Sequence, residues 1–142
     1  MDLSAEQLAF LESTRSAAMI TVAPSGVAKA ARVGVALVDG RLWSSGTQER
    51  ARTRRLRRDP RCTLFVFDAS QRWLALETTV TILEGDEVAD QSIALFRVMQ
   101  ARPSGPLSWF GGDLDDDAFR RAMRDERRLI YDFTVERCYG LP

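Results

Sequence analysis

The stretch ARVGVALVDGRLWSS, residues 31–45, decides the class of the fold. Residues 31–38 read as a strand, Asp39-Gly40 is a strong signal for a two-residue hairpin turn, and residues 41–45 read as the returning strand. A two-residue turn joins strands that run in opposite directions. This stretch therefore predicts an antiparallel sheet.

Strands with similar features precede and follow this hairpin. An apolar run suits a buried strand, and the two longest segments carry their large apolar side chains on one face. Trp73 faces away from the apolar set of its segment. The additional strands span residues 18–23, 62–67, 72–84 and 129–139. With the hairpin, the chain has about six predicted strands.

Short helices are predicted between the strands. Ser4 can cap the first of them, with Gln7 at the third helical position. Asp59-Pro60 ends the second. The predicted helices cover residues 4–15, 48–58, 88–101 and 115–127, and residues 103–112 are predicted to form a loop.

The order of these elements favours a mainly β protein with one domain, residues 1–142. A chain of this length is too short for two sheets that each bury a core of their own. The βαβ rhythm of a parallel Rossmann sheet is missing. Because closure removes exposed sheet edges, a closed or partly closed antiparallel barrel fits best.

The chain contains no histidine. Histidine-based triads, histidine general bases and nearly all zinc sites are therefore excluded. Cys62 and Cys138 lie in apolar, strand-like surroundings and are interpreted as buried free thiols, so no metal site is expected. No apolar run approaches the ~20 residues that span a bilayer. Residues 1–15 lack the pattern of a signal peptide, and we expect a cytoplasmic protein without membrane contact.

A concentration of positive charge follows the hairpin. Residues 50–61, RARTRRLRRDPR, hold seven arginines, whereas the net charge of the whole chain is zero. At 3.6 residues per turn, Arg52 points away from the others. One side of the helix is predicted to carry Arg50, Arg54, Arg57, Arg58 and Arg61.

Three interpretations fit this arginine segment. It forms a solvated helix with acidic partners such as residues 113–117, it binds nucleic acid, or it holds the phosphate of a cofactor or ligand. Overall neutrality weakens the nucleic-acid interpretation, and no nucleic-acid partner is expected. Free N–H groups in the first helical turn and bidentate guanidinium groups favour the phosphate site.

The arginine segment resembles the phosphate-binding segment of the pyridoxamine-phosphate-oxidase-like split β-barrel superfamily. It is most similar to the branch of actinobacteria that uses the deazaflavin coenzyme F420. The ending CYGLP, residues 138–142, and residues 119–129, with paired arginines ahead of a strand, also resemble that branch. The resemblance covers nearly the whole chain. It implies a six-stranded antiparallel split β-barrel of the Greek-key type, assembled as a homodimer with two cofactor sites at the interface.

By position in this motif, the resemblance implies that Arg50, Arg52 and Thr53 hold the phosphate of the cofactor. The family usually has lysine where Arg52 stands, so the charge is kept but the phosphate geometry can differ. Ser45 is then expected beside the ring or its ribityl chain. A basic groove for an anionic tail is expected to use Arg54, Arg57 or Arg58.

The motif predicts the contacts with the phosphate more specifically than the contacts with the cofactor ring and the substrate. Trp73 either stacks on a ring or packs in the core or dimer. Val35 either packs closely within the barrel or lines the ring through its backbone groups. Trp109 and Phe110 form either a cover over the site or a hydrophobic plug in the dimer.

The resemblance implies an enzyme that transfers hydride from reduced F420 to a small conjugated organic substrate. The cofactor carries the chemistry, and no catalytic side chain is predicted. One alternative is an oxidase or reductase of the same fold that uses flavin mononucleotide (FMN). Another is a protein that binds F420 without catalysis.

Overall fold

The computed structural model describes residues 2–142, so Met1 of the predicted domain lies outside the described part. The strands are β1 (Ser16–Val22), β2 (Ala28–Gly34), β3 (Ala36–Val38), β4 (Arg41–Thr47), β5 (Arg61–Phe67), β6 (Trp73–Leu83), β7 (Leu107–Trp109), β8 (Gly112–Leu114) and β9 (Arg128–Leu141). The helices are α1 (Ala5–Ser13), α2 (Ala51–Arg58), α3 (Val88–Gln100) and α4 (Asp116–Asp125). Strands dominate, as the sequence predicted.

One curled antiparallel sheet forms the body of the molecule. Its seven strands follow the order β2-β1-β5-β6-β9-β4-β3. The longest pairing joins β6 to β9, with a bulge between Glu77 and Thr78. Such a curled sheet is the half-barrel expected of a split barrel.

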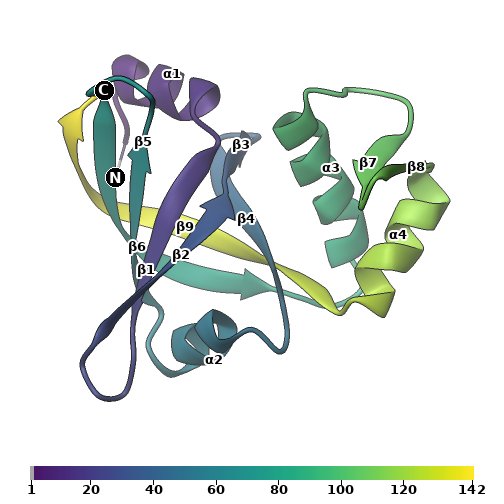
Figure 1. The fold of residues 1–142 in the computed structure, drawn as a ribbon, viewed down its shortest axis with the longest axis horizontal. Coiled ribbons are helices and arrows are strands. Elements are labelled where there is room, and N and C mark those ends of the chain that lie inside the picture. The colour runs from purple at the N-terminus through teal and green to yellow at the C-terminus, as the bar shows by residue number, and fades with distance from the viewer. Residues whose placement is uncertain (1) are drawn as a thin grey trace.

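The helices lie around this sheet in three places (Figure 1). Helix α1 lies at one end of the curled sheet and α2 at the other. Helices α3 and α4 form a lobe on one side with the two-stranded β7-β8 ribbon. The arrangement leaves the start of α2 next to the end of β4, where the chain enters the helix.

Three apolar clusters support this architecture. The largest fills the inside of the curled sheet and contains the side chains predicted to share one face of β9, Leu129, Tyr131, Phe133 and Val135. A second lies between the sheet and α3, around Trp43 and Ile130. The third holds the lobe together through Phe119 and Met123 of α4.

The sheet has one strand more than the six that were predicted. The predicted strand over residues 31–38 is divided into β2 and β3 at Val35, whose N–H donates to Arg15 O at 2.9 Å instead of joining the ladder. Gly34, just before the break, packs against the end of the Met99 side chain, which a Cβ at this position would overlap. Contacts with distant residues cause the division, and local periodicity does not show them.

The predicted loop over residues 103–112 is also corrected, since it contains β7 and the start of β8. Phe110 and Gly111 form the turn, with φ values of 48° and 82°. Positive φ at both turn residues is typical of a tight hairpin turn. The predicted helices are present, with boundaries shifted by a few residues, and Ser4 and Gln7 form the predicted capping box.

Candidate anion site at the start of α2

The junction between β4 and α2 is held in place by buried hydrogen bonds. The Thr53 hydroxyl donates to Thr47 O at 2.7 Å. It also makes a short hydrogen bond with the Tyr131 hydroxyl, which comes from β9. The Arg50 N–H donates to the same Thr47 carbonyl at 3.4 Å. The start of the helix is therefore tied to the central strands of the sheet.

The first turn of α2 offers N–H groups to a ligand. Thr53 and Arg54 donate their N–H groups to Arg50 O. Those of Ala51 and Arg52 have no hydrogen-bond partner among the described residues. Arg50 occupies the N-cap without a side-chain cap, and the first turn contains no acidic residue. A helix start of this kind favours an anion.

Acidic side chains neutralise only a small part of the arginine segment. Arg57 pairs with Glu84 at 3.0 Å and lowers the pKa of that carboxyl. Arg61 pairs with Asp59 at 2.8 Å and, by hydrogen bonding, lowers the Asp59 pKa to about 2. Within this segment, the arginines that form no ion pair with an acidic side chain of residues 2–142 are Arg50, Arg52, Arg54, Arg55 and Arg58. An anionic ligand would complete the charge balance at this end of the sheet.

Two buried polar atoms near the junction have no partner in the described structure. One is Nε of Arg52, whose guanidinium carbon lies 5.9 Å from the centroid of the Tyr131 ring. The other is Oγ of Ser45, two residues before the end of β4. Unsatisfied buried polar groups cost about 1–3 kcal/mol each, so a ligand or water that reaches them is favoured.

A basic groove runs along one side of α2. Its volume is about 270 Å³, and it lies between α2 and the turn after β1. The side chains of this groove are held by neutral groups: Arg55 donates to the Thr21 hydroxyl at 2.7 Å, and Arg58 donates to Val22 O. Arg54, from the predicted tail groove, also lines it. Arg58, the second predicted candidate, lines the groove as well, whereas Arg57, the third, points to Glu84.

The predicted helical stripe needs one correction. Arg61 was expected to share a helix side with Arg50, but α2 ends at Arg58 and Arg61 begins β5. Pro60 causes the change, because the residue before a proline leaves helical geometry and Asp59 is extended. The charge on the helix is therefore concentrated within two turns.

Other predicted site residues do not present their side chains to the free N–H groups of α2. Thr53 is completely buried and its hydroxyl is fully used, so it supports the junction and its side chain offers no surface to a ligand. Val35 has no exposed surface and belongs to the main core, so its side chain cannot line a ring. Trp73 starts β6 opposite Leu141, whereas the segment that follows α2 meets β6 at Val80, whose N–H donates to Pro60 O.

Two residues that contact the site were not singled out from the sequence. Tyr131 was predicted only as part of the apolar face of the strand over residues 129–139; it is completely buried and also anchors Thr53. Arg127 belongs to the paired arginines before β9, and it meets Glu49 in an ion pair. No spacing rule links positions so far apart in the chain, so only the fold identifies them.

Other kinds of site are not apparent among residues 2–142. No group of three or more histidine, cysteine or acidic side chains is placed to hold a metal ion. Both cysteines are free thiols, and burial raises the pKa of Cys62 to about 12, which makes it a poor nucleophile. None of the helices described is long and apolar enough to cross a bilayer.

Comparison with known proteins gives one family for the chain and several similar structures. The family model of pyridoxamine 5′-phosphate oxidase matches residues 3–140. A conserved hypothetical protein of Mycobacterium tuberculosis has a TM-score of 0.74 at 18% identity, with 99% of this chain and 85% of that chain covered. A protein described as an F420 reductase has a TM-score of 0.69 at 20% identity, with 98% of each chain covered. A structure described as a pyridoxamine 5′-phosphate oxidase from Listeria innocua has a TM-score of 0.67 at 14% identity, covering 96% and 95%.

Proposed function

Since the chain belongs to the pyridoxamine 5′-phosphate oxidase family of split barrels, we propose that it is an oxidoreductase that uses reduced coenzyme F420 to reduce a small conjugated organic substrate. The observation that carries this proposal is the group of arginines around the first turn of α2 that lack acidic partners. They surround free backbone N–H groups in a chain whose net charge is zero. The similarity to an F420 reductase supports the choice of cofactor.

The residues at this site fit a phosphate-bearing cofactor. Arg50 and the N–H groups of Ala51 and Arg52 would bind the phosphate. The unpartnered Nε of Arg52 and Oγ of Ser45 would gain hydrogen bonds from the same ligand. Arg54 would lead an anionic tail toward the groove that it lines. When bound, the deazaflavin supplies hydride, and the protein supplies binding and orientation.

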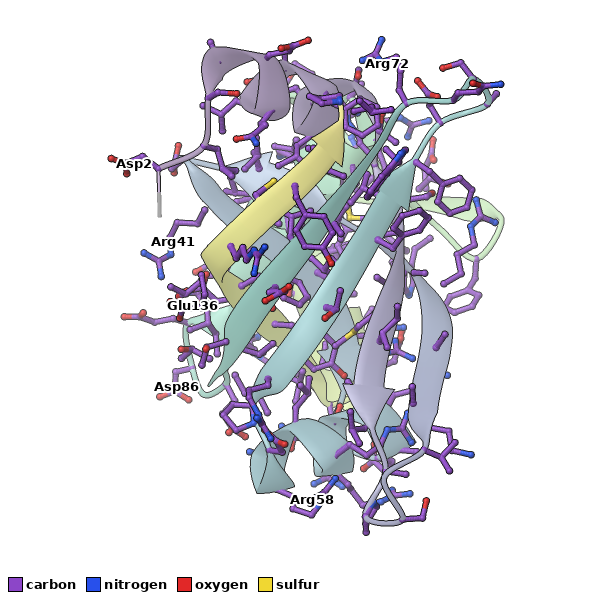
Figure 2. All side chains as sticks on the ribbon, turned by 90° about the vertical axis from the view of Figure 1, so that its left-hand side faces the viewer. Asp2, Arg41, Arg58, Arg72, Asp86 and Glu136 are labelled. Atoms are coloured by element: carbon purple, nitrogen blue, oxygen red, sulfur yellow. The ribbon has the colours of Figure 1, made fainter. Side chains whose placement is uncertain are left out.

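The proposal includes a homodimer with the cofactor sites at its interface. An apolar surface on the outer face of the sheet supports it. Phe67 and Leu141 are 55% and 65% exposed, and Tyr139 packs edge-on against Trp73 at 6.2 Å. Figure 2 looks onto this face, where β9, β6, β5 and β1 run side by side between α1 and α2. Contiguous exposed apolar area of this kind marks an interaction surface.

A groove on the same face extends the apolar surface. Its volume is about 560 Å³, and its lining includes Ala18, Ala30, Ala31 and Phe67. Small side chains on a strand surface let another backbone approach closely. In such a dimer Trp73, which is remote from α2 of its own subunit, would be placed to contribute to the partner's site.

The proposal is tested by titrating the purified protein with F420 and, separately, with FMN, while fluorescence is followed. We expect micromolar or tighter binding of F420 that is lost in the Arg50→Ala/Arg52→Ala variant. Arg102→Ala/Arg121→Ala, in the lobe of α3 and α4, is the matched control. It removes the same charge at positions away from α2 and should bind as the wild type does.

The outcomes separate the alternatives. Preference for FMN would keep the fold and move the chemistry to a flavin oxidase or reductase. Tight F420 binding without turnover of enones, quinones or other conjugated acceptors would indicate a protein that binds the cofactor only. Absence of binding to either cofactor would contradict the proposal.

A further inference from the structure

Arg127 lies beside the start of α2 although 76 positions separate it from Ala51. It forms the junction between α4 and β9, and its carbonyl accepts a hydrogen bond from the Gln48 N–H at 3.2 Å. The next residue, Arg128, pairs with Thr47 at the end of β4. The junction therefore adjoins the short segment that leads from β4 into the candidate site.

The backbone of Arg127 adopts a conformation that favours glycine. Its φ is 53°, in the left-handed region, directly after the C-cap Glu126 of α4. Helices commonly end with glycine at this position, because a side chain there costs free energy. The backbone of Arg127 makes two hydrogen bonds that hold the junction: its N–H donates to Arg124 O, and its carbonyl accepts from the Gln48 N–H. Glycine would keep both.

Among residues 2–142, the side chain of Arg127 has one ion-pair partner, and that partner is exposed. Its guanidinium pairs with the Glu49 carboxylate, and the two side chains are 66% and 59% exposed. Exposed ion pairs contribute little to stability because water and salt screen them. Stability alone therefore does not account for an arginine in a strained position. Residues held in such conformations are often found at ligand sites.

We propose that Arg127 is an anion-binding residue of the α2 site. Its guanidinium exchanges the Glu49 carboxylate for an anionic group of the ligand that binds at the free N–H groups of α2. That group is a phosphate or a carboxylate, since a guanidinium binds both in the same bidentate way. This inference rests on the proposed function, which supplies a ligand with such groups.

The test compares Arg127→Gly with Ala101→Gly. Ala101 follows α3 with the same φ of 53°, so glycine relieves a similar strain there without removing a charge. We expect both variants to melt at or above the wild-type temperature. Arg127→Gly alone should weaken binding of the anionic cofactor by about tenfold or more, the scale of a charge-assisted hydrogen bond. Arg127→Lys should recover part of the affinity.

Three ligands identify which anion is bound. If Arg127→Gly binds FMN more weakly than the wild type does but binds riboflavin equally well, Arg127 contacts the phosphate. If Arg127→Gly binds F420 more weakly but binds FMN and riboflavin as the wild type does, Arg127 contacts the carboxylate tail of F420. Equal affinity of Arg127→Gly and wild type for every ligand would overturn the inference. A lower melting temperature of Arg127→Gly would also overturn it, since the side chain would then be structural.

Thermal stabilisation by inorganic pyrophosphate separates this inference from the proposed function. If the wild type binds neither flavin nor F420, the proposed function fails. Pyrophosphate should still raise the melting temperature of the wild type and of Ala101→Gly more than that of Arg127→Gly. An equal shift in the three proteins, or no shift in any, would contradict a role for Arg127 in anion binding.

Discussion

Tyr131 joins the candidate site to the core. Its ring is completely buried, and its hydroxyl meets Thr53 at the start of α2. The ring passes directly over Gly46 of β4, where a Cβ would overlap it. The guanidinium carbon of Arg52 lies over the same ring, 5.9 Å from its centroid. One side chain thus sets the position of β4, of α2 and of a candidate ligand contact.

Gly46→Ala should therefore destabilise the protein by about 1–3 kcal/mol, the usual cost of an overpacked core. The buried ring has no room to move away from the added methyl group. Tyr131→Phe keeps the ring and loses only the hydroxyl, which should cost about 1 kcal/mol. Urea unfolding of both variants measures these values. A Gly46→Ala variant as stable as the wild type would show that the ring does not pack against β4.

At the scale of elements, β9 carries a buried charge in the middle of the sheet. The side chain of Asp132 is 4% exposed. In the sheet, Asp132 lies between Trp43 of β4 and Thr81 of β6, its partners on the two neighbouring strands. Its charged partner is Arg41, which follows the β3-β4 hairpin turn and binds the carboxylate through two nitrogens. This pair joins the edge hairpin to the central strand. A buried carboxylate without its partner is costly.

Arg41→Ala should consequently lower the free energy of unfolding by about 1–3 kcal/mol, since the Asp132 carboxylate would keep its burial and lose its charged hydrogen bonds. Arg72→Ala is a suitable control. Arg72 forms an ion pair with Asp68, whose carboxylate is more exposed than that of Asp132. Loss of this ion pair should lower the free energy of unfolding by at most about 1 kcal/mol. Denaturant titration distinguishes the two. Equal effects would mean that water already satisfies Asp132.

At the scale of the whole molecule, exposed apolar side chains gather on two distant surfaces. One is the outer face of the sheet, with Phe67 and Leu141. The other is the tip of the β7-β8 ribbon, where Phe110 is 85% exposed and packs edge-on against Trp109 at 5.1 Å. The lobe that carries Phe110 lies on another side of the molecule (Figure 1). A dimer formed through the sheet would leave this tip free.

We expect the wild type to sediment with twice the mass of the chain, and Phe67→Glu/Leu141→Glu to be a folded monomer. Two charges placed in an apolar interface would lose their hydration. Phe110→Glu is the control, since it adds a charge to an exposed aromatic position outside that face. Analytical ultracentrifugation with circular dichroism measures mass and folding. A monomeric wild type, or a dimer that persists in the double variant, would contradict the proposed assembly.

The sequence predicted the class of the fold well and its strand count less well. Alternation in β6 and β9, the Asp39-Gly40 turn and the Ser4 cap are local signals, and each element appears where it was expected. The break at Val35 was not predictable, because its cause is a hydrogen bond to Arg15. The β7 and β8 strands are three residues each, too short to show a period.

For the candidate site, the sequence by itself determined the density of arginine in residues 50–58 and the place of a helix start among them. Charge and helix ends follow from neighbouring residues. Only the tertiary structure decided which of these arginines remain without acidic partners. It also showed that Thr53 is buried and holds the junction between β4 and α2, and that Arg127 adjoins the site. Ion pairs, burial and contacts across the sheet depend on how distant segments pack. The periodicity of side chains along one segment does not predict that packing.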